Sequence, residues 1–297
     1  MNRRFLIAVI VAALTVLAPV MHATTAAAAW PKFNPPKSYY LALGDSLTFG
    51  YQEFKVQAQV AATGNVYTVA PFNTGYVDDF AKVLAPLSPG IQTVNYGCPG
   101  ETSTSFRTPG GCYWQTVQGR PLHNAFPVTG SQLDAALTFL GQHPGQVSPI
   151  TLDLGANDLL AILAECNNDV TNQSCLLPKL HDALSTFTGN LSSSLTSLRA
   201  AAPYSEIIVM ENFDPIGAPL TLYGVSQLNQ IIVQAAGASG ARVADAFTPF
   251  NVAPPPGQTL CTLTLFCTQG DIHASDTGYQ VIADQFWAAS GYSRLSD

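Results

Sequence analysis

The chain has 297 residues, of which 47% are hydrophobic and only 10% are charged, and its formal net charge is −7. This is enough apolar material for one well-filled core or two small ones. The acidic balance and the lack of any lysine- and arginine-rich run argue against a nucleic-acid partner. The sequence also contains no G-x-x-x-x-G-K phosphate-binding loop.

The first 29 residues have the pattern of a secretory signal peptide. Arg3 and Arg4 precede an apolar run over 5–20, and four alanines at 26–29 precede Trp30. The run is too short for a comfortable membrane span, so we expect cleavage before Trp30 and no stable membrane span. A retained N-terminal anchor is the alternative. Cleavage would leave 10 basic and 19 acidic residues, a net charge of −9. We expect the remaining chain, residues 30–297, to be a secreted, extracellular protein with a single domain.

Segments typical of strands and helices alternate along the rest of the chain. Strands are predicted over 39–43, 91–95, 150–154, 206–211 and 241–246, and helices over 75–84, 131–140, 159–164, 180–202, 220–238 and 276–290. The segment 53–67 has no clear pattern. We expect a loop bounded by cysteines over 166–175 and long irregular loops over 96–130 and 248–270. Alternation of this kind predicts a parallel sheet between two helical layers.

Polar residues follow several of these predicted strands. Ser46 comes after the first strand, in the stretch Gly44-Asp45-Ser46, where a helix begins. In open α/β sheets ligands bind at the carboxyl edge of the strands. A serine there can be a nucleophile beside backbone N–H donors, or it can simply be a helix N-cap. The stretch 41–50 by itself leaves both interpretations of Ser46 open.

Four motifs taken together resemble the SGNH, or GDSL, hydrolases over nearly the whole chain after residue 30. They are G-D-S-L at 44–47, the loop glycine Gly100, G-x-N-D at 155–158 and D-x-H at 271–273. The resemblance implies an α/β fold, a flavodoxin-like three-layer sandwich with a five-stranded parallel sheet. It also implies a GDSL-type lipase or esterase, a carboxylic ester hydrolase that needs no cofactor.

The resemblance also assigns roles to individual residues. Ser46 matches the nucleophile and His273 the general base, while Ser46, Gly100 and Asn157 match the donors of the oxyanion hole. The family's third catalytic residue is an aspartate three positions before the histidine, but this chain has Gly270 there. We favour Asp271, two positions before, as the third member; a backbone carbonyl of residues 268–270 is the alternative.

The six cysteines fall into three close pairs, as expected of an exported protein. They are Cys98, Cys112, Cys166, Cys175, Cys261 and Cys267. Six cysteines allow 15 pairings, and pairing in chain order is the simplest prediction. No C-x-x-C motif occurs and no histidine lies at ligand spacing from a cysteine, so we expect no metal site.

The substrate is predicted less sharply. Many apolar residues in the loops favour a small-molecule or lipid ester with an apolar acyl group, although the same residues could simply pack beneath the loops. The candidates are Phe49, Tyr51, Phe72, Phe106, Tyr113, Trp114, Phe126, Leu263, Leu265 and Phe266. A carbohydrate acetylesterase and a non-catalytic secreted binding module are the alternatives. We expect the protein to be a monomer. Three histidines are expected at its surface: His123, His143 and His181. Three aspartates near the motifs are expected in caps and turns around the site: Asp45, Asp153 and Asp158.

Overall fold

A computed structural model describes residues 33–64, 67–253 and 257–295. The predicted signal peptide and its cleavage site lie outside these residues. Five parallel strands form one sheet in the order β2-β1-β3-β4-β5. They are β1 (Tyr39–Gly44), β2 (Gln92–Asn95), β3 (Val147–Asp153), β4 (Ile207–Glu211) and β5 (Arg242–Asp245). This is the flavodoxin-like strand order, in which the chain changes direction between β1 and β3, and it confirms the predicted fold class.

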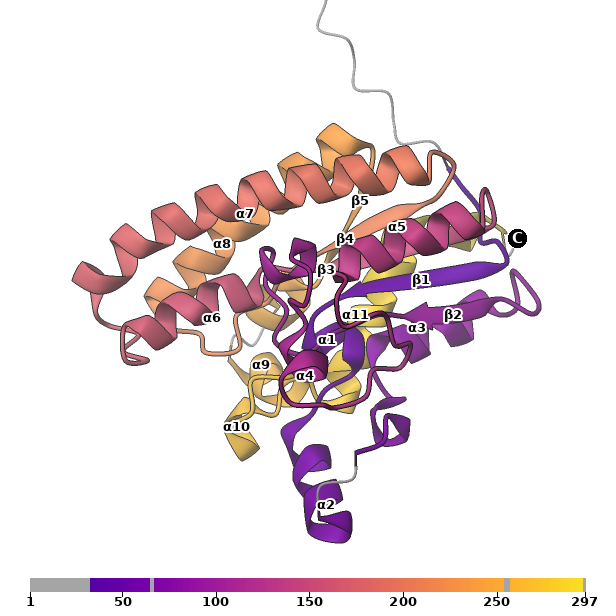
Figure 1. The fold of residues 1–297 in the computed structure, drawn as a ribbon. Helices are drawn as coiled ribbons and strands as arrows, with labels where there is room; N and C mark the ends of the chain where they lie inside the picture. The colour runs from indigo at the N-terminus through magenta and orange to yellow at the C-terminus, as the bar shows by residue number, and fades with distance from the viewer. Residues whose placement is uncertain (1–32, 65–66, 254–256, 296–297) are drawn as a thin grey trace, which may run out of the picture. The chain divides into compact units, whose positions relative to one another are not determined.

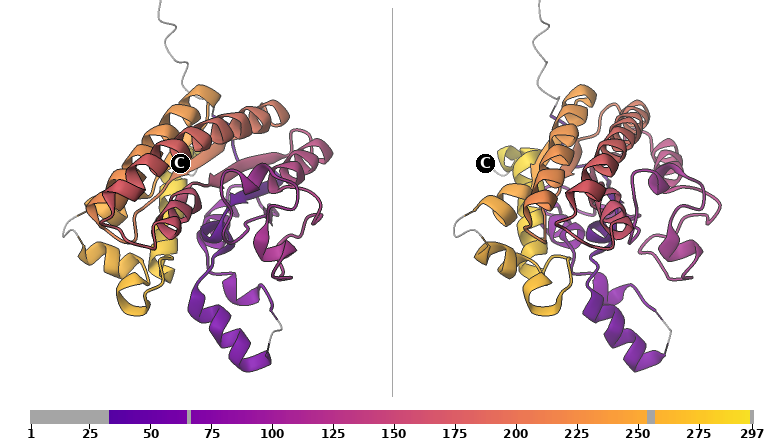
Figure 2. Two further views of the ribbon diagram at one scale, coloured as in Figure 1. Left: turned by 60° about the vertical axis from the view of Figure 1, so that its left-hand side comes forward. Right: turned by 90° about the vertical axis from the view of Figure 1, so that its left-hand side faces the viewer.

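Helices cover both faces of the sheet (Figure 1). On one face lie α5 (Gln132–Gln142), α7 (Gln173–Ala201) and α8 (Pro219–Ser239), and on the other lie α3 (Tyr76–Leu84) and α11 (Asp276–Ser290). Figure 2 shows the same layering from two further directions, with α7 and α8 side by side. The sheet is therefore the middle of three layers.

Alternating side chains of the strands fill two separate cores. Leu41 and Leu43 of β1 pack against α5, α7 and α8, whereas Tyr40 and Ala42 pack against α3 and α11. Successive strand residues point to opposite faces of a sheet, so a strand buried on both faces is apolar at nearly every position. All of 40–44 is buried, which is why this segment could be recognised as a strand from sequence.

Shorter elements connect these layers. They are α1 (Ser46–Phe49), α2 (Glu53–Thr63), α4 (Tyr113–Thr116), α6 (Ala156–Glu165), α9 (Gln258–Leu263) and α10 (Phe266–Gln269). The patternless segment after residue 53 is thus the helix α2, which projects from the sheet in all three views (Figures 1 and 2). Only Val56 of α2 is buried, so its sequence carries no amphipathic periodicity.

The predicted cysteine loop over 166–175 is shorter than expected, because α7 begins at Gln173 and not at residue 180. The Asn172 side chain accepts a hydrogen bond from the Cys175 N–H at 3.1 Å, which caps the new first turn. Pro178 lies inside the helix, and a proline there normally argues for a later start. Among the described residues, no helix is long and apolar enough to cross a membrane.

Candidate active site

Ser46 is the first residue of α1, directly beyond the carboxyl end of β1. The helix is capped by Asp45, whose Oδ1 accepts a hydrogen bond from the Leu47 N–H at 2.9 Å. Because Asp45 does the capping, the hydroxyl of Ser46 is not used as an N-cap. Gly44 allows this tight turn: it has φ of +143°, and a Cβ there would lie 1.6 Å from Oδ1 of Asp153.

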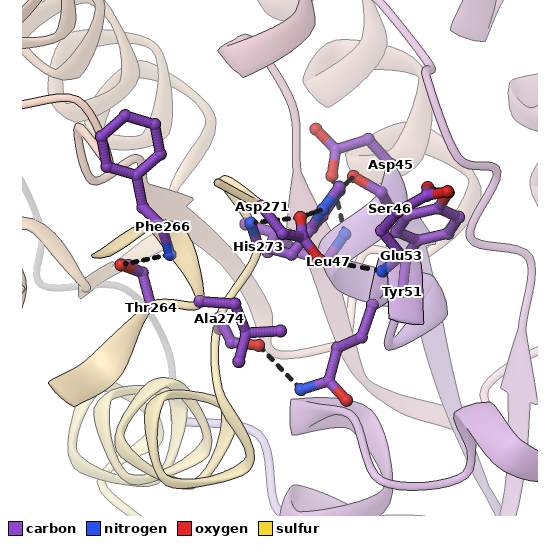
Figure 3. Close-up of polar contacts among 12 residues, drawn as sticks. Asp45, Ser46, Leu47, Tyr51, Glu53, Thr264, Phe266, Asp271, His273 and Ala274 are labelled. Atoms are coloured by element: carbon purple, nitrogen blue, oxygen red, sulfur yellow. Dashed lines mark hydrogen bonds and ion pairs between the residues drawn. The ribbon is translucent and has the colours of Figure 1, made fainter. Parts of the chain in front are cut away.

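Ser46, His273 and Asp271 form a continuous hydrogen-bonded chain (Figure 3). The Ser46 Oγ lies 3.0 Å from Nε2 of His273, and the His273 Nδ1 lies 2.5 Å from Oδ1 of Asp271. The side chains of His273 and Asp271 are only 15% and 6% exposed. Asp271 therefore reaches the imidazole although it is one position closer in sequence than the family pattern requires.

The Asp271 carboxylate is held in its ionised form. Burial raises its pKa, but the hydrogen bond and the charge of His273, together with two backbone N–H groups, outweigh burial and place the pKa below its ordinary value. The backbone donors are the N–H of Glu53 to Oδ2 at 2.8 Å and the N–H of His273 to Oδ1 at 3.1 Å. An ionised carboxylate accepting several N–H bonds is expected to titrate low.

The segment carrying His273 is fastened to the chain just after α1. Besides the Glu53–Asp271 bond, the Gln52 Nε2 donates to the carbonyl of Ala274 at 2.9 Å, and the Tyr279 hydroxyl donates to the carbonyl of Tyr51 at 2.7 Å. Figure 3 shows the contact between Glu53 and Asp271 beside the imidazole. The residues that follow Ser46 thus set the position of His273.

Gly100 and Asn157 lie beside Ser46 at the same edge of the sheet, all three lining one cavity. The φ of Gly100 is +84°, a conformation that a residue with a Cβ rarely adopts. Within the part of the chain that the structure describes, no hydrogen bond uses the N–H of Gly100 or of Ser46. The Asn157 Nδ2 donates to Oδ2 of Asp45 at 3.1 Å and to the carbonyl of Glu101 at 3.0 Å.

Buried carboxyl groups surround these donors. Burial, followed by the neighbouring charge of Asp153, raises the pKa of Asp45 well above its usual range, and burial also raises the pKa of Asp153. The two buried carboxyls interact closely, so the pair is expected to retain a proton near neutral pH. Burial raises the pKa of Glu101 to about 7. The Asp158 carboxylate accepts from the Ser103 N–H at 2.9 Å and fixes the loop that carries Gly100.

The cavity beside Ser46 has a volume of about 410 Å³ and two chemically different ends. One end is made mainly by apolar side chains of α6, the first turns of α7 and α8, and the chain after β4: Leu159, Leu160, Ile162, Leu163, Leu176, Leu180, Phe213, Ile216, Leu220 and Val225. The other end is made by Tyr51, Tyr113, Trp114 and Arg120.

Most of the apolar residues expected to line the site have a packing role instead. Phe49, Phe72, Phe106, Phe126 and Leu263 are buried in the cores, and Leu265 and Phe266 do not border the cavity. Of the ten candidates only the three aromatic residues Tyr51, Tyr113 and Trp114 line it. The apolar end is built mainly from helix residues whose sequence pattern is that of ordinary core positions.

Two of the histidines expected at the surface are partly buried. The Nε2 of His123 lies 2.9 Å from the carbonyl of Phe49, and burial lowers the pKa of this imidazole. His143 packs on Tyr39 and Phe139, with ring centroids 4.4 Å from each. His181 is exposed, as expected. None of the three borders the cavity.

The cysteines pair in chain order, as Cys98–Cys112, Cys166–Cys175 and Cys261–Cys267. The first bridge joins the Gly100 loop to the start of α4, and the third lies just before the His273 segment. Over the described ranges, one group of side chains has the proximity of metal ligands, namely Cys98, Glu101 and Cys112. Two of its three members are consumed by a disulfide, so the group does not fit a metal ion.

Comparison with known proteins identifies the family. The model of the GDSL-like lipase/acylhydrolase family matches residues 42–281. Two similar solved structures are an acetylxylan esterase from Geobacillus stearothermophilus (18% identity, TM-score 0.52, covering 88% of this chain and 97% of that one) and a lipase from a goat rumen metagenome (17% identity, TM-score 0.52, covering 86% and 99%). No curated protein sequence matched the chain. The chain therefore belongs to the GDSL-like lipase/acylhydrolase family and is a carboxylic ester hydrolase of that family.

Proposed function

We propose that this protein is a secreted serine esterase that cleaves esters with an apolar acyl chain through an acyl-enzyme on Ser46. The observation that carries the proposal is the chain Asp271–His273–Ser46, with contacts of 2.5 and 3.0 Å, opening into a cavity lined by leucines. A serine hydroxyl is a weak nucleophile by itself, and a base within hydrogen-bond reach activates it.

The reaction follows from this geometry in two halves. The Ser46 Oγ forms a bond to the ester carbonyl carbon while its proton passes to Nε2 of His273. The Nδ1 of His273 keeps its own proton, which it donates in a hydrogen bond to the Asp271 carboxylate. The tetrahedral intermediate then collapses, the C–O bond to the alcohol breaks, and the alcohol leaves with the proton from Nε2. Water repeats the sequence on the acyl-enzyme and releases the carboxylic acid.

We assign three donors to the developing oxyanion, because all three residues line the same cavity: the N–H groups of Ser46 and Gly100 and the side-chain amide of Asn157. The two backbone groups have no other partner in the described chain, so they are available without breaking an existing bond. Backbone donors held in advance stabilise a transition state at little reorganisation cost. The two N–H groups of the Asn157 amide donate to Asp45 and to the Glu101 carbonyl, so one of them is shared with the oxyanion or redirected to it when the tetrahedral intermediate forms.

The leucine-lined end of the cavity favours a medium or long acyl chain over acetate. Full burial of one CH₂ contributes about 0.8 kcal/mol, so kcat/KM is expected to rise roughly fourfold per carbon until the cavity is filled. Hydrolysis of p-nitrophenyl esters from acetyl to palmitoyl tests this. A maximum at acetyl would contradict the proposal and support the alternative, a carbohydrate acetylesterase, in which Tyr51, Tyr113 and Trp114 would stack on sugar rings.

Ser46→Ala tests the mechanism and excludes a non-catalytic binding module. The variant is expected to lose ester hydrolysis and labelling by a fluorophosphonate while melting at the wild-type temperature, because the Ser46 side chain lies at the surface of the cavity. Thr48→Ala is unsuitable as a control because its hydroxyl contacts Asp153. Ser293→Ala, outside the cavity lining, is a better one. Wild-type activity in Ser46→Ala would refute the assignment.

Secretion is proposed from the amino-terminal sequence and is supported by three disulfides, which persist in oxidising compartments. Amino-terminal sequencing of protein from the culture medium should begin at Trp30. A chain that stays with the cells and begins at Met1 would indicate a retained anchor. We further propose that the enzyme acts as a monomer, which light scattering can measure.

A further inference from the structure

At the aromatic end of the cavity lies a guanidinium group whose charge the proposed mechanism does not use. Arg120 belongs to the long segment between β2 and α5 that reads in sequence as irregular. Its guanidinium carbon lies 4.2 Å from the ring centre of Tyr67 and 4.4 Å from that of Trp114. Cation–π contacts of this kind hold the group in one place.

This guanidinium has capacity for a further partner. Arginine offers five N–H donors, and among the residues described one hydrogen bond uses them, from Nη2 to the Tyr67 hydroxyl at 2.9 Å. None of the ion pairs found in the described chain involves Arg120. The acidic residue at the same end, Glu53, accepts instead from the hydroxyl of Tyr51. A fixed cation therefore faces the cavity without a bound carboxylate.

The position of Arg120 relative to the reacting atoms indicates which part of an ester it would meet. The Tyr51 ring packs on His273 with centroids 4.6 Å apart, and Trp114 packs on Tyr51 at 5.6 Å. Arg120 is thus connected to the imidazole through two rings. His273 must protonate the departing alcohol, so the alcohol lies on this side, whereas the leucines lie beyond Asn157 along α6.

We infer that Arg120 is a specificity-determining residue that binds an anionic group on the alcohol part of the ester, so that the substrate class is an acyl ester of an acidic alcohol. The inference rests on the proposed esterase function. A planar guanidinium pairs with phosphate or carboxylate through two parallel N–H bonds, and its weak hydration suits a half-buried position. The aromatic rings orient the guanidinium before substrate binds, which lowers the entropy cost of binding.

Two kinds of acidic alcohol offer this chemistry: a glycerol phosphate and an acidic sugar. Matched hexanoyl esters distinguish them. One pair is the ester of glycerol 3-phosphate with that of glycerol, and the other is the ester of glucuronate with that of glucose. All four esters are assayed at low salt and at concentrations at which they are dissolved as single molecules and do not form micelles. Because a hydrogen bond between two charged groups is stronger than one between neutral groups, but this site is open to solvent, we expect about a tenfold higher kcat/KM for the anionic member of at least one pair.

The Arg120→Gln variant should remove this preference while leaving kcat/KM for the neutral esters within about twofold. Arg294→Gln is the matched control, because its guanidinium also lies over a ring, that of Phe33 at 5.3 Å, but outside the cavity lining. Half-molar salt should likewise shrink the preference of the wild-type enzyme, because it screens exposed charges. This arm does not depend on whether the variant folds.

The outcomes separate the two levels of the argument. If the wild-type enzyme hydrolyses none of these esters nor p-nitrophenyl hexanoate, the proposed function fails. If it hydrolyses neutral and anionic members of both pairs equally well, the esterase assignment stands and the role of Arg120 is refuted. Equal losses of activity on neutral and anionic esters in Arg120→Gln would also refute it, because they would show a packing role for the guanidinium.

Discussion

Replacing Asp271 by asparagine tests the position at which this chain departs from the family pattern. The substitution keeps the shape of the side chain but removes its negative charge. Oδ1 of Asp271 accepts from Nδ1 and from the backbone N–H of His273, and Oδ2 accepts from the N–H of Glu53. An asparagine has only one oxygen, so its NH₂ group must face at least one of these donors.

The size of the expected loss follows from this arrangement. If the NH₂ group faces Nδ1, the imidazole carries its proton on Nε2 and can no longer accept the proton of Ser46. In either orientation the imidazolium formed during attack loses its carboxylate partner, and at 6% exposure of the Asp271 side chain solvent replaces little of that interaction. The same change in a serine protease lowers kcat about 10⁴-fold, and we expect a loss of roughly 10³–10⁴-fold here.

The assay is steady-state hydrolysis of p-nitrophenyl hexanoate at pH 7.5, with the melting temperature measured in parallel. Asp276→Asn is the matched control, because Asp276 accepts a hydrogen bond from Gln52 in the same segment but does not contact the imidazole. Its kcat should stay within about threefold of wild type. A loss of tenfold or less in Asp271→Asn, with the fold intact, would refute the reasoning and favour orientation of the ring by a backbone carbonyl.

Four further predictions follow from the same site. Asn157→Ala should lower kcat by roughly 10²–10³-fold, because it removes one proposed oxyanion donor, and it should also lower the melting temperature, because the buried Asp45 carboxyl and Glu101 carbonyl lose their hydrogen bonds to the amide; unchanged kcat would remove the residue from the oxyanion hole. Glu101→Gln should stabilise the protein above pH 7 relative to wild type. The pKa of Glu101 in the folded protein, about 7, exceeds its ordinary value of 4.5, so the wild-type protein loses stability as the pH rises between these two values; unfolding midpoints at pH 5 and pH 8 check the sign. Peptide mapping without reduction should recover the three bridges in chain order, and any crossed pairing would contradict this prediction. Removal of the Cys98–Cys112 bridge, whose cysteines are 14 residues apart, should lower the free energy of unfolding by about 3 kcal/mol. Chelation by EDTA should leave the rate unchanged, and a loss restored by a divalent cation would reveal an unrecognised site.

The fold was accessible from sequence because the central strands β1, β3 and β4 are buried on both faces. Runs such as 39–43 and 207–210 are apolar throughout, and parallel strands separated by helices permit few topologies. Elements that bury little were missed for the same reason. The helix α2 buries only Val56, and the first turns of α7 are set by the Asn172 cap rather than by an apolar face.

The candidate site was only partly accessible. Polar residues after strands indicate a site because the carboxyl ends of parallel strands share one edge, and this brought Ser46 and Asn157 together correctly. The apolar end of the cavity could not be predicted, since leucines such as Leu159 and Leu180 have the same spacing whether they face a core or a cavity. The contacts of Gln52 and Glu53 with the His273 segment could not be predicted either, because they join positions more than 200 residues apart in sequence.

The buried carboxyl groups around the oxyanion donors have a common physical consequence. The Asp45 carboxyl accepts a hydrogen bond from the Asn157 amide, and the Glu101 carboxyl lies close enough to Asp45 to interact with its charge. In their ionised forms both would add negative charge near the proposed position of the oxyanion and oppose its formation. Burial keeps Glu101 largely protonated below pH 7 and leaves the Asp45–Asp153 pair with a proton to share. A neutral carboxyl can still accept the hydrogen bonds that orient Asn157 and cap α1, without adding charge. The same desolvation that makes these groups costly to ionise therefore preserves the electrostatic character of the proposed oxyanion hole. Stability is expected to fall as the pH rises from the ordinary carboxyl pKa toward the raised folded-state pKa, and turnover is expected to fall as the pH passes the raised pKa and the folded-state groups ionise.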